Sequence, residues 1–397
     1  MRYQLRYVRM YPTRHRLIRC GHTLADNPER PSWPGVGRWH VVGSVEWIRG
    51  GDESVTAGEP TAWLGGLIGT GLVESADNLA ATTSTGRWSV VMDFDGRVRC
   101  HRFASWRPGA ASDMAGPWQG PAAGDYRTSL DRQAYEAAVE SVREDIADGR
   151  LYQANICRVL SARVSDASRA DILGLAALLE EGNPSPYAGA IRIPDEGLEV
   201  ATASPELFIS LDGRTVSSGP IKGTASRTSD LSEKDRAENV MIVDLVRNDL
   251  SRVCEPGSVE VPSLLRIEHH PTIVHLVSTI SGILRPDIGL ASIAEAAFPP
   301  GSVTGAPKYT ALQVISELEP SSRGPYCGAI GWVDADAGTA QLAVAIRTFW
   351  KTEEEGEAML HFGTGAGITW GSDAAAEWDE SVLKAEHLIS VAAGEKR

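Results

Sequence analysis

Apolar residues recur at helical spacing in the part of the chain that follows position 125. Between residues 130 and 149 they stand three or four positions apart, which predicts an amphipathic helix. Its apolar face consists of Tyr135, Ala138, Val142 and Ile146. Similar patterns predict further helices over 172–181, 234–253, 290–297, 307–318 and 373–391.

Shorter apolar runs that end at turn residues predict β-strands. Residues 1–125 are rich in Gly, Pro and Trp and contain two such runs, 39–47 and 88–94. The later runs are 151–159, 188–193, 207–211, 326–333, 339–349 and 358–364. Because strands and helices do not alternate regularly, the pattern predicts an α+β fold rather than a doubly wound sheet. Near Asp125 the pattern changes from short strand-like runs to a helical repeat, which separates a region 1–125 from a region 126–397. We expect the two regions to form one intertwined globular unit.

Composition and charge narrow the class of protein. The chain has 397 residues, of which 42% are hydrophobic and 23% charged, as in ordinary globular proteins. A net charge of -14, without clustered Lys and Arg, argues against a nucleic-acid-binding surface. Any anionic ligand must therefore be held by a local cation or by backbone N–H groups.

Cysteine usage and hydropathy point to an intracellular setting. The five cysteines are widely spaced and contain no CxxC pair, so neither a disulfide framework nor a zinc site is indicated. No apolar run follows the basic N-terminus, and none elsewhere approaches the ~18 residues of a membrane span. We expect a soluble, cytoplasmic protein that binds neither nucleic acid nor membrane.

Two helical segments carry acidic faces. Asp235 and Glu238 lie three residues apart, and Glu377, Glu380 and Lys384 share another face. A divalent cation between two such helices would receive oxygen ligands from each, and Mg²⁺ suits this because it takes only one or two carboxylates directly. On spacing alone, such pairs are more often solvated helix faces.

Two glycine-rich segments, 298–308 and 362–369, could turn backbone N–H groups toward an anion. Neither is a Walker loop, and both could be simple turns. Arg347 stands in an apolar run, and a buried arginine needs an anionic partner, either an internal carboxylate or a ligand. Lys222 lies between Ile221 and Gly223; a desolvated lysine becomes a neutral nucleophilic amine, although an isolated lysine is usually a surface residue.

From residue 151 onward these features occur within motifs that resemble the chorismate-utilising enzymes, a family that includes anthranilate, aminodeoxychorismate, isochorismate and salicylate synthases. The matching segments, in the family's order, are YQANICR, NPSPY, ASPELF, PIKGT, KDRAENVMIVDLVRNDLSRVCEPGSVEV, VHLVSTISG, PPGSVTGAPK, RGPYCGAIGW, AIRT, GTGAGIT and AAEWDESVLKA. The resemblance implies the fold of anthranilate synthase component I, a large mixed β-sheet sandwich flanked by helices. It makes 126–397 the chorismate-binding catalytic region and 1–125 a divergent N-terminal part.

The resemblance also implies a metal site. Glu238 and Glu380 match the direct Mg²⁺ ligands, and Asp235 and Glu377 match partners that act mainly through water. The cation would hold the ring carboxylate of chorismate. That would explain how an acidic protein binds a dianion.

Other positions match those that contact the substrate. Ser302 and the backbone of Gly223 correspond to groups beside the ring carboxylate. The positions that match the enolpyruvyl carboxylate site are Tyr326, Arg347 and the backbone of Gly365, Ala366 and Gly367. His275 matches a histidine packed beside the ring, and the alternative is an ordinary core histidine.

Three positions select a branch of the family. Glu206 matches the general acid that protonates the departing hydroxyl at carbon 4. Gln153 stands where the water-using members carry a lysine, so ammonia is the expected incoming group. Lys222 gives PIKGT, typical of aminodeoxychorismate synthases, where anthranilate synthases typically have PIAGT.

The chain therefore most resembles aminodeoxychorismate synthase component I, which forms 4-amino-4-deoxychorismate through a covalent lysine adduct, for 4-aminobenzoate and thus folate or a secondary metabolite. The resemblance implies a separate glutamine amidotransferase subunit as the ammonia source and a downstream aminodeoxychorismate lyase, since no glutaminase nucleophile motif is found. Anthranilate synthase component I is the nearest alternative. A non-catalytic chorismate-binding regulatory subunit is the second.

Overall fold

The computed structural model describes residues 58–114, 116–225, 227–269 and 274–395. The strand expected at 39–47 lies outside the described residues. The helices are α1 (Arg132–Ala147), α2 (Ile172–Gly182), α3 (Glu233–Ser251), α4 (Leu290–Ala297), α5 (Lys308–Leu318) and α6 (Ala374–Ala392). Their bounds differ from those expected from apolar spacing by at most two residues.

Strands of 2 to 12 residues make up the rest of the framework. They are β1 (Thr61–Leu64), β2 (Leu67–Ala76), β3 (Arg87–Met92), β4 (Val98–Pro108), β5 (Arg127–Thr128), β6 (Gln153–Arg163), β7 (Tyr187–Ile193), β8 (Leu198–Ser204), β9 (Leu207–Asp212), β10 (Thr215–Gly219), β11 (Ile221–Ala225), β12 (Glu260–His269), β13 (Val274–Ile283), β14 (Gly305–Ala306), β15 (Ala329–Asp334), β16 (Thr339–Val344), β17 (Thr348–Glu354) and β18 (Glu357–Ile368). The run expected at 339–349 is two strands, because the chain breaks at Arg347, whose φ is 53°.

The strands form one continuous series of antiparallel pairs. Neighbours follow the order β6, β18, β17, β8, β7, β1, β2, β4, β3, β15, β16, β9, β10, β13 and β12. The pairings between the described strands are all antiparallel, so the sheet is more uniform than the mixed sheet expected. The N-terminal strands are built into the same sheet, since β1 pairs with β7 and β3 with β15.

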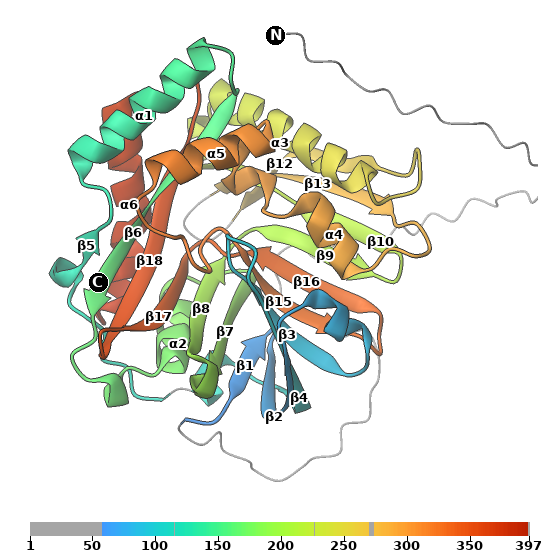
Figure 1. The fold of residues 1–397 in the computed structure, drawn as a ribbon, viewed down its shortest axis with the longest axis vertical. Helices are drawn as coiled ribbons and strands as arrows, with labels where there is room; N and C mark the ends of the chain where they lie inside the picture. The colour runs from blue at the N-terminus through green and yellow to red at the C-terminus, as the bar shows by residue number, and fades with distance from the viewer. Residues whose placement is uncertain (1–57, 115, 226, 270–273, 396–397) are drawn as a thin grey trace, which may run out of the picture. The chain divides into compact units, whose positions relative to one another are not determined.

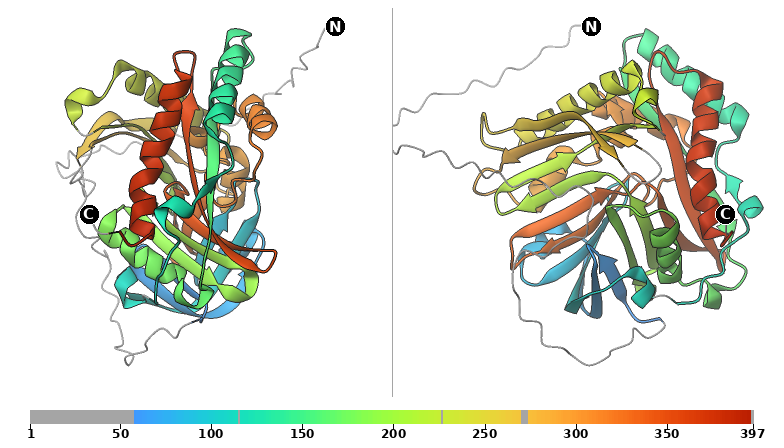
Figure 2. Two further views of the ribbon diagram at one scale, coloured as in Figure 1. Left: turned by 90° about the vertical axis from the view of Figure 1, so that its left-hand side faces the viewer. Right: turned by 180° about the vertical axis from the view of Figure 1, so that it is seen from behind.

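Helices cover this sheet at several places (Figures 1 and 2). Helices α1 and α6 lie side by side, with α6 against β18 and α1 against β6, while α3 packs on β13 and α2 on β7 and β8. The largest apolar core contains Trp88 of β3, Val200 of β8, Leu342 of β16 and Ile293 of α4. The predicted α+β fold, a sheet flanked by helices, is confirmed.

Local sequence explains where the helices begin. Asp131 caps α1 by accepting a hydrogen bond from the backbone N–H of Ala134 (2.8 Å), and Asp373 caps α6 through Ala376 (2.9 Å). Within the described residues, no helix combines the length and apolar character needed to cross a bilayer. The four described cysteines, at positions 100, 157, 254 and 327, are free thiols.

Candidate active site

Ser302 is the point at which segments distant in sequence meet. It lies in a short 3-10 turn, Gly301–Val303, and is 6% exposed. Its backbone carbonyl accepts hydrogen bonds from Nζ of Lys222 and from Nδ2 of Asn155, both at 3.1 Å. Its side chain is hydrogen-bonded to Glu206. The structure therefore brings the predicted Lys222, Glu206 and Ser302 together.

Glu206 lies between β8 and β9 and is 4% exposed. Burial raises the pKa of its carboxyl group from 4.5 to about 7, because the charged form is poorly solvated there. Hydrogen bonds from Ser302 and from the backbone N–H of Ile221, and the charge of Lys222, act in the opposite direction. A carboxyl group that keeps its proton near neutral pH is suited to general-acid work.

Lys222 lies on β11 and is partly buried. Burial lowers the pKa of its amine, while the charges of Glu238, Glu206 and Glu380 favour the protonated form. More of this amine is neutral at a given pH than in an exposed lysine. Glu206 and Lys222 thus form an acid and a candidate nucleophile whose pKa values are drawn toward neutrality from opposite sides.

Gly367 of β18 allows three polar side chains to approach the strand. A methyl group at this position would lie 2.5 Å from Nε2 of Gln153, 3.1 Å from Oδ1 of Asn155 and 3.5 Å from Nζ of Lys222. Gln153 is fully buried, and neither atom of its amide has a hydrogen-bond partner among the described residues. A buried amide without a protein partner is normally hydrogen-bonded to water or to a ligand.

The four predicted metal ligands lie on two helices. Glu238 on α3 and Glu380 on α6 both act on the charge of Lys222, so both carboxylates lie near the candidate site. One oxygen of Asp235 accepts from the Ser232 N–H (2.8 Å) and hydroxyl (2.6 Å), and Oε1 of Glu377 accepts from the Ser372 hydroxyl (2.6 Å).

These carboxylates fit a magnesium ion better than a closed metal cage. Among the described residues no group of three or more His, Cys, Asp and Glu side chains is arranged to hold a metal alone. Mg²⁺ needs only one or two protein carboxylates when water and substrate oxygens complete its shell. Oε1 of Glu380 is also engaged, with Nζ of Lys384 at 2.6 Å, so only the family resemblance assigns Asp235 and Glu377 to contact through water.

Gly223 and His275 lie on neighbouring strands beside Lys222. Gly223 has a φ of +81°, which favours glycine, and a methyl group there would lie 2.8 Å from Cβ of Asp235. His275 is 1% exposed on β13, where its backbone pairs with residue 224 of β11. The histidine is thus placed next to the strand that carries Lys222 and Gly223.

Most of the residues predicted to hold the enolpyruvyl carboxylate lie on or against β18, and Arg347 directly precedes β17, which pairs with β18. The ring of Tyr326 lies against Gly363, where a methyl group would be 2.1 Å from Cγ of the ring. Arg347 has a pKa lowered by burial, and its guanidinium has no carboxylate partner among the described residues. Ala366 turns its side chain into the core beside α1, so its part in a site would be played by its backbone.

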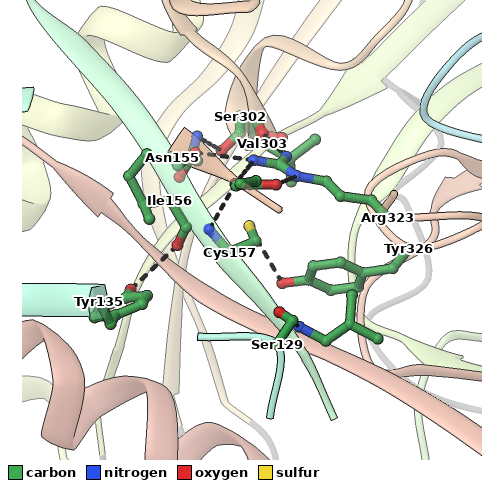
Figure 3. A network of polar contacts seen from close by, with 11 residues as sticks. Ser129, Tyr135, Asn155, Ile156, Cys157, Ser302, Val303, Arg323 and Tyr326 are labelled. Atoms are coloured by element: carbon green, nitrogen blue, oxygen red, sulfur yellow. Dashed lines mark hydrogen bonds and ion pairs between the residues drawn. The ribbon is translucent and has the colours of Figure 1, made fainter. Parts of the chain in front are cut away.

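Sequence reasoning missed Asn155 and Arg323, which Figure 3 shows among the site segments, and Glu319, which pairs with Arg323. Arg323 forms a buried ion pair with Glu319 and donates to the carbonyls of Asn155 and Val303. Asn155 could have been found, because it lies two positions after Gln153 on β6 and so faces the same side. Arg323 shows no such local signal.

The described part of the chain combines a large antiparallel sheet with a buried acid, a lysine amine and two acidic helices. Comparison with known proteins gives the family that shares this arrangement. The model of the chorismate binding enzymes matches residues 95–390. The chain therefore belongs to the chorismate binding enzyme family.

Relatives within this family carry two different activities in their names. An Arabidopsis thaliana protein named "Aminodeoxychorismate synthase, chloroplastic" is 41% identical over 266 residues, 64% of this chain and 28% of the relative. Aminodeoxychorismate synthase component 1 of Klebsiella aerogenes is 38% identical over 276 residues, 66% of this chain and 59% of the relative. Anthranilate synthase component 1 of Streptomyces coelicolor is 37% identical over 310 residues, 74% of this chain and 59% of the relative. The chain spans between about a quarter and three fifths of the length of these relatives.

Solved structures show the same fold. A Bacillus anthracis protein whose structure is titled "putative 2,3-dihydroxybenzoate-specific isochorismate synthase" superposes with a TM-score of 0.70 at 23% identity, covering 86% of this chain and 98% of that one. Anthranilate synthase component I from Streptococcus pneumoniae gives a TM-score of 0.69 at 22% identity, covering 87% and 95%. The expected anthranilate synthase component I-like fold is confirmed.

Proposed function

We propose that this chain is an aminodeoxychorismate synthase, which replaces the carbon 4 hydroxyl of chorismate with an amino group. The observation that carries the proposal is the pairing of Lys222 and Glu206 on one residue, Ser302, with pKa values moved toward neutrality from opposite sides. Relatives named aminodeoxychorismate synthase at 38–41% identity support it.

The first half of the reaction uses both groups at once. The neutral amine of Lys222 attacks ring carbon 2 while Glu206 donates its proton to the carbon 4 hydroxyl, which leaves as water. The ring double bonds shift to connect the two events. The product of this half is a ring tethered to Lys222 and an ionised Glu206.

The second half releases the tether. Ammonia adds at carbon 4, the double bonds return, and the Lys222 amine leaves from carbon 2. We assign the buried amide of Gln153 to the approach side of ammonia, since its unpartnered oxygen could accept an N–H. The enolpyruvyl group stays attached, giving 4-amino-4-deoxychorismate.

The remaining residues bind and orient the substrate. Arg347 and Tyr326 would meet the enolpyruvyl carboxylate beside the backbone of 365–367, and Ser302 and Gly223 would lie by the ring carboxylate. His275 would pack against the ring. Glu238 and Glu380 would hold Mg²⁺, with Asp235 and Glu377 reached through water; when bound, the cation would neutralise the ring carboxylate.

The expected partners follow from this chemistry. A glutamine amidotransferase subunit would supply ammonia, and an aminodeoxychorismate lyase would remove pyruvate to give 4-aminobenzoate for folate or a secondary metabolite. We place the enzyme in the cytoplasm.

A product assay tests the function. The protein is incubated with chorismate, Mg²⁺ and an ammonium salt at raised pH, and the product is identified by mass with and without an added lyase. We expect 4-amino-4-deoxychorismate, converted to 4-aminobenzoate only when the lyase is present. Lys222→Ala should abolish this product, whereas Lys351→Ala, which removes a partly buried lysine paired with Glu199, should not. Full activity of Lys222→Ala would rule out the covalent step.

Two other functions remain as outcomes of the same assay. Direct appearance of fluorescent anthranilate would establish anthranilate synthase activity, which the Streptomyces coelicolor relative favours. Binding of chorismate without any product would identify a non-catalytic subunit.

A further inference from the structure

The ion pair of Arg323 and Glu319 is deeply buried and is joined to the site by hydrogen bonds. Their side chains are 2% and 6% exposed. Nε and one terminal nitrogen of Arg323 donate to the two carboxylate oxygens of Glu319, at 2.8 and 2.6 Å. The guanidinium also lies 4.3 Å from the ring centre of Phe94. This geometry leaves Arg323 little freedom to move.

The rest of the guanidinium ties two segments of the site together (Figure 3). It donates to the carbonyl of Val303 at 3.0 Å and to the carbonyl of Asn155 at 2.9 Å. Oε1 of Glu319 accepts a further hydrogen bond from the backbone N–H of Cys157 at 2.8 Å. The pair therefore helps to fix the distance between the Gly301–Val303 turn and β6, together with the backbone hydrogen bond from Asn155 to Thr304.

The Ser302 carbonyl lies between these fixed points. Val303, the next residue, has its carbonyl hydrogen-bonded to Arg323. The Ser302 carbonyl itself accepts a hydrogen bond from the side chain of Asn155, and the carbonyl of Asn155 is also hydrogen-bonded to Arg323. The Ser302 carbonyl also accepts a hydrogen bond from Nζ of Lys222. A shift of the turn relative to β6 would move the acceptor of Lys222.

We propose that Arg323, held by Glu319, is a positioning residue that aims the Lys222 amine through the carbonyl of Ser302. An amine that donates one N–H to a fixed acceptor has its lone pair directed away from that acceptor. The reacting nitrogen must stand about 3–3.5 Å from the ring carbon with its lone pair aligned, and a misplacement near 1 Å can cost about 100-fold in rate. The inference rests on the proposed function, in which Lys222 is the nucleophile.

The experiment measures the step that Lys222 performs. Enzyme is mixed with chorismate and Mg²⁺ without ammonium, quenched with acid at intervals, and the Lys222 adduct is quantified by intact mass. Steady-state kcat and KM with ammonium and the melting temperature are measured in parallel. The variants are Arg323→Lys and Asn155→Leu.

The matched control is Arg192→Lys. Arg192 also forms a buried ion pair, with Asp171, its side chain is 4% exposed, and it donates to the carbonyl of Glu59. Both Arg→Lys changes replace a fork of donors with a single ammonium, so both should lower the melting temperature.

We expect Arg323→Lys to slow adduct formation and kcat by about 10- to 100-fold, while the KM for chorismate changes less than about 2-fold. Asn155→Leu, which removes one donor to the Ser302 carbonyl without breaking an ion pair, should slow the adduct by about 10-fold. Arg192→Lys should form the adduct at the wild-type rate.

Equal rates in Arg323→Lys and Arg192→Lys would overturn the positioning role. If Arg323→Lys does not fold, Asn155→Leu decides: a slowed adduct with kcat reduced and KM kept supports the role, and a wild-type rate overturns it. A wild-type enzyme that makes no Lys222 adduct would instead remove the covalent step of the proposed function, and this inference with it, whereas the product assay alone decides whether carbon 4 is aminated.

Discussion

Replacing Glu206 with glutamine should change how the stability of the protein depends on pH. The carboxyl group has a pKa of about 7 in the folded protein and an ordinary value of 4.5 when unfolded. Between these two values the unfolded chain releases the proton while the folded chain keeps it. The stabilising contribution of the protonated group is therefore complete below pH 4.5 and is lost as the pH rises through 7.

The magnitude follows from the same two values. The difference between 4.5 and about 7 corresponds to roughly 3 kcal/mol of unfolding free energy, as an order of magnitude for a buried group. Glutamine has nearly the same shape and does not titrate. Relative to Glu206→Gln, the wild type should therefore lose about 3 kcal/mol between pH 4.5 and pH 8.

Urea unfolding at several pH values measures this difference. The other titrating groups are common to both proteins, so they cancel when the two free energies of unfolding are subtracted. Glu353→Gln, at an exposed position on β17, serves as the control for the loss of one carboxyl group. A flat difference for Glu206→Gln would show that Glu206 titrates normally in the folded protein, and the general-acid reasoning would fail.

Two further predictions concern the substrate and the metal. Arg347→Gln should raise the KM for chorismate by about 10- to 100-fold without lowering the melting temperature, because the guanidinium lacks a carboxylate partner among the described residues and a charged hydrogen bond to substrate is worth about 1.5–3 kcal/mol. A lowered melting temperature with an unchanged KM would assign Arg347 to the fold instead. Removal of divalent cations with EDTA should stop turnover and added Mg²⁺ should restore it, and Glu238→Gln should raise the half-saturating Mg²⁺ concentration at least about 10-fold. Turnover unaffected by EDTA would contradict the metal site.

The helices were readable from the sequence because each has one apolar face. Helix α4 begins and ends where its apolar spacing predicts, at Leu290 and Ala297. Strand β8 was missed because Leu198–Ser204 contains a glutamate and two alanines, residue types that are depleted in strands. The break at Arg347 was also missed, because a left-handed backbone at a non-glycine residue leaves no mark in the hydrophobic pattern.

The residues of the candidate site were likewise predicted only in part. Motifs that resemble a known family pointed to Lys222, Glu206 and Ser302, and the structure brings these together. It was not foreseeable that the backbone carbonyl of Ser302 would be the shared acceptor, since backbone atoms are the same at every position. Asn155 and Arg323 are 168 residues apart in sequence, so their contact arises only from the pairing of distant segments.

The antiparallel pairing of β6 with β18 has a consequence for how the protein is made. Leu160 pairs with Phe362, so β6 waits for its partner while roughly 200 residues are synthesised, which takes about 10 to 40 s at 5–20 residues per second. During that interval a strand that is almost wholly buried in the finished protein exposes its apolar side chains. Contacts this distant in sequence also slow folding, because a long loop must close before they form. A chaperone that binds extended apolar segments should therefore raise the yield of folded enzyme.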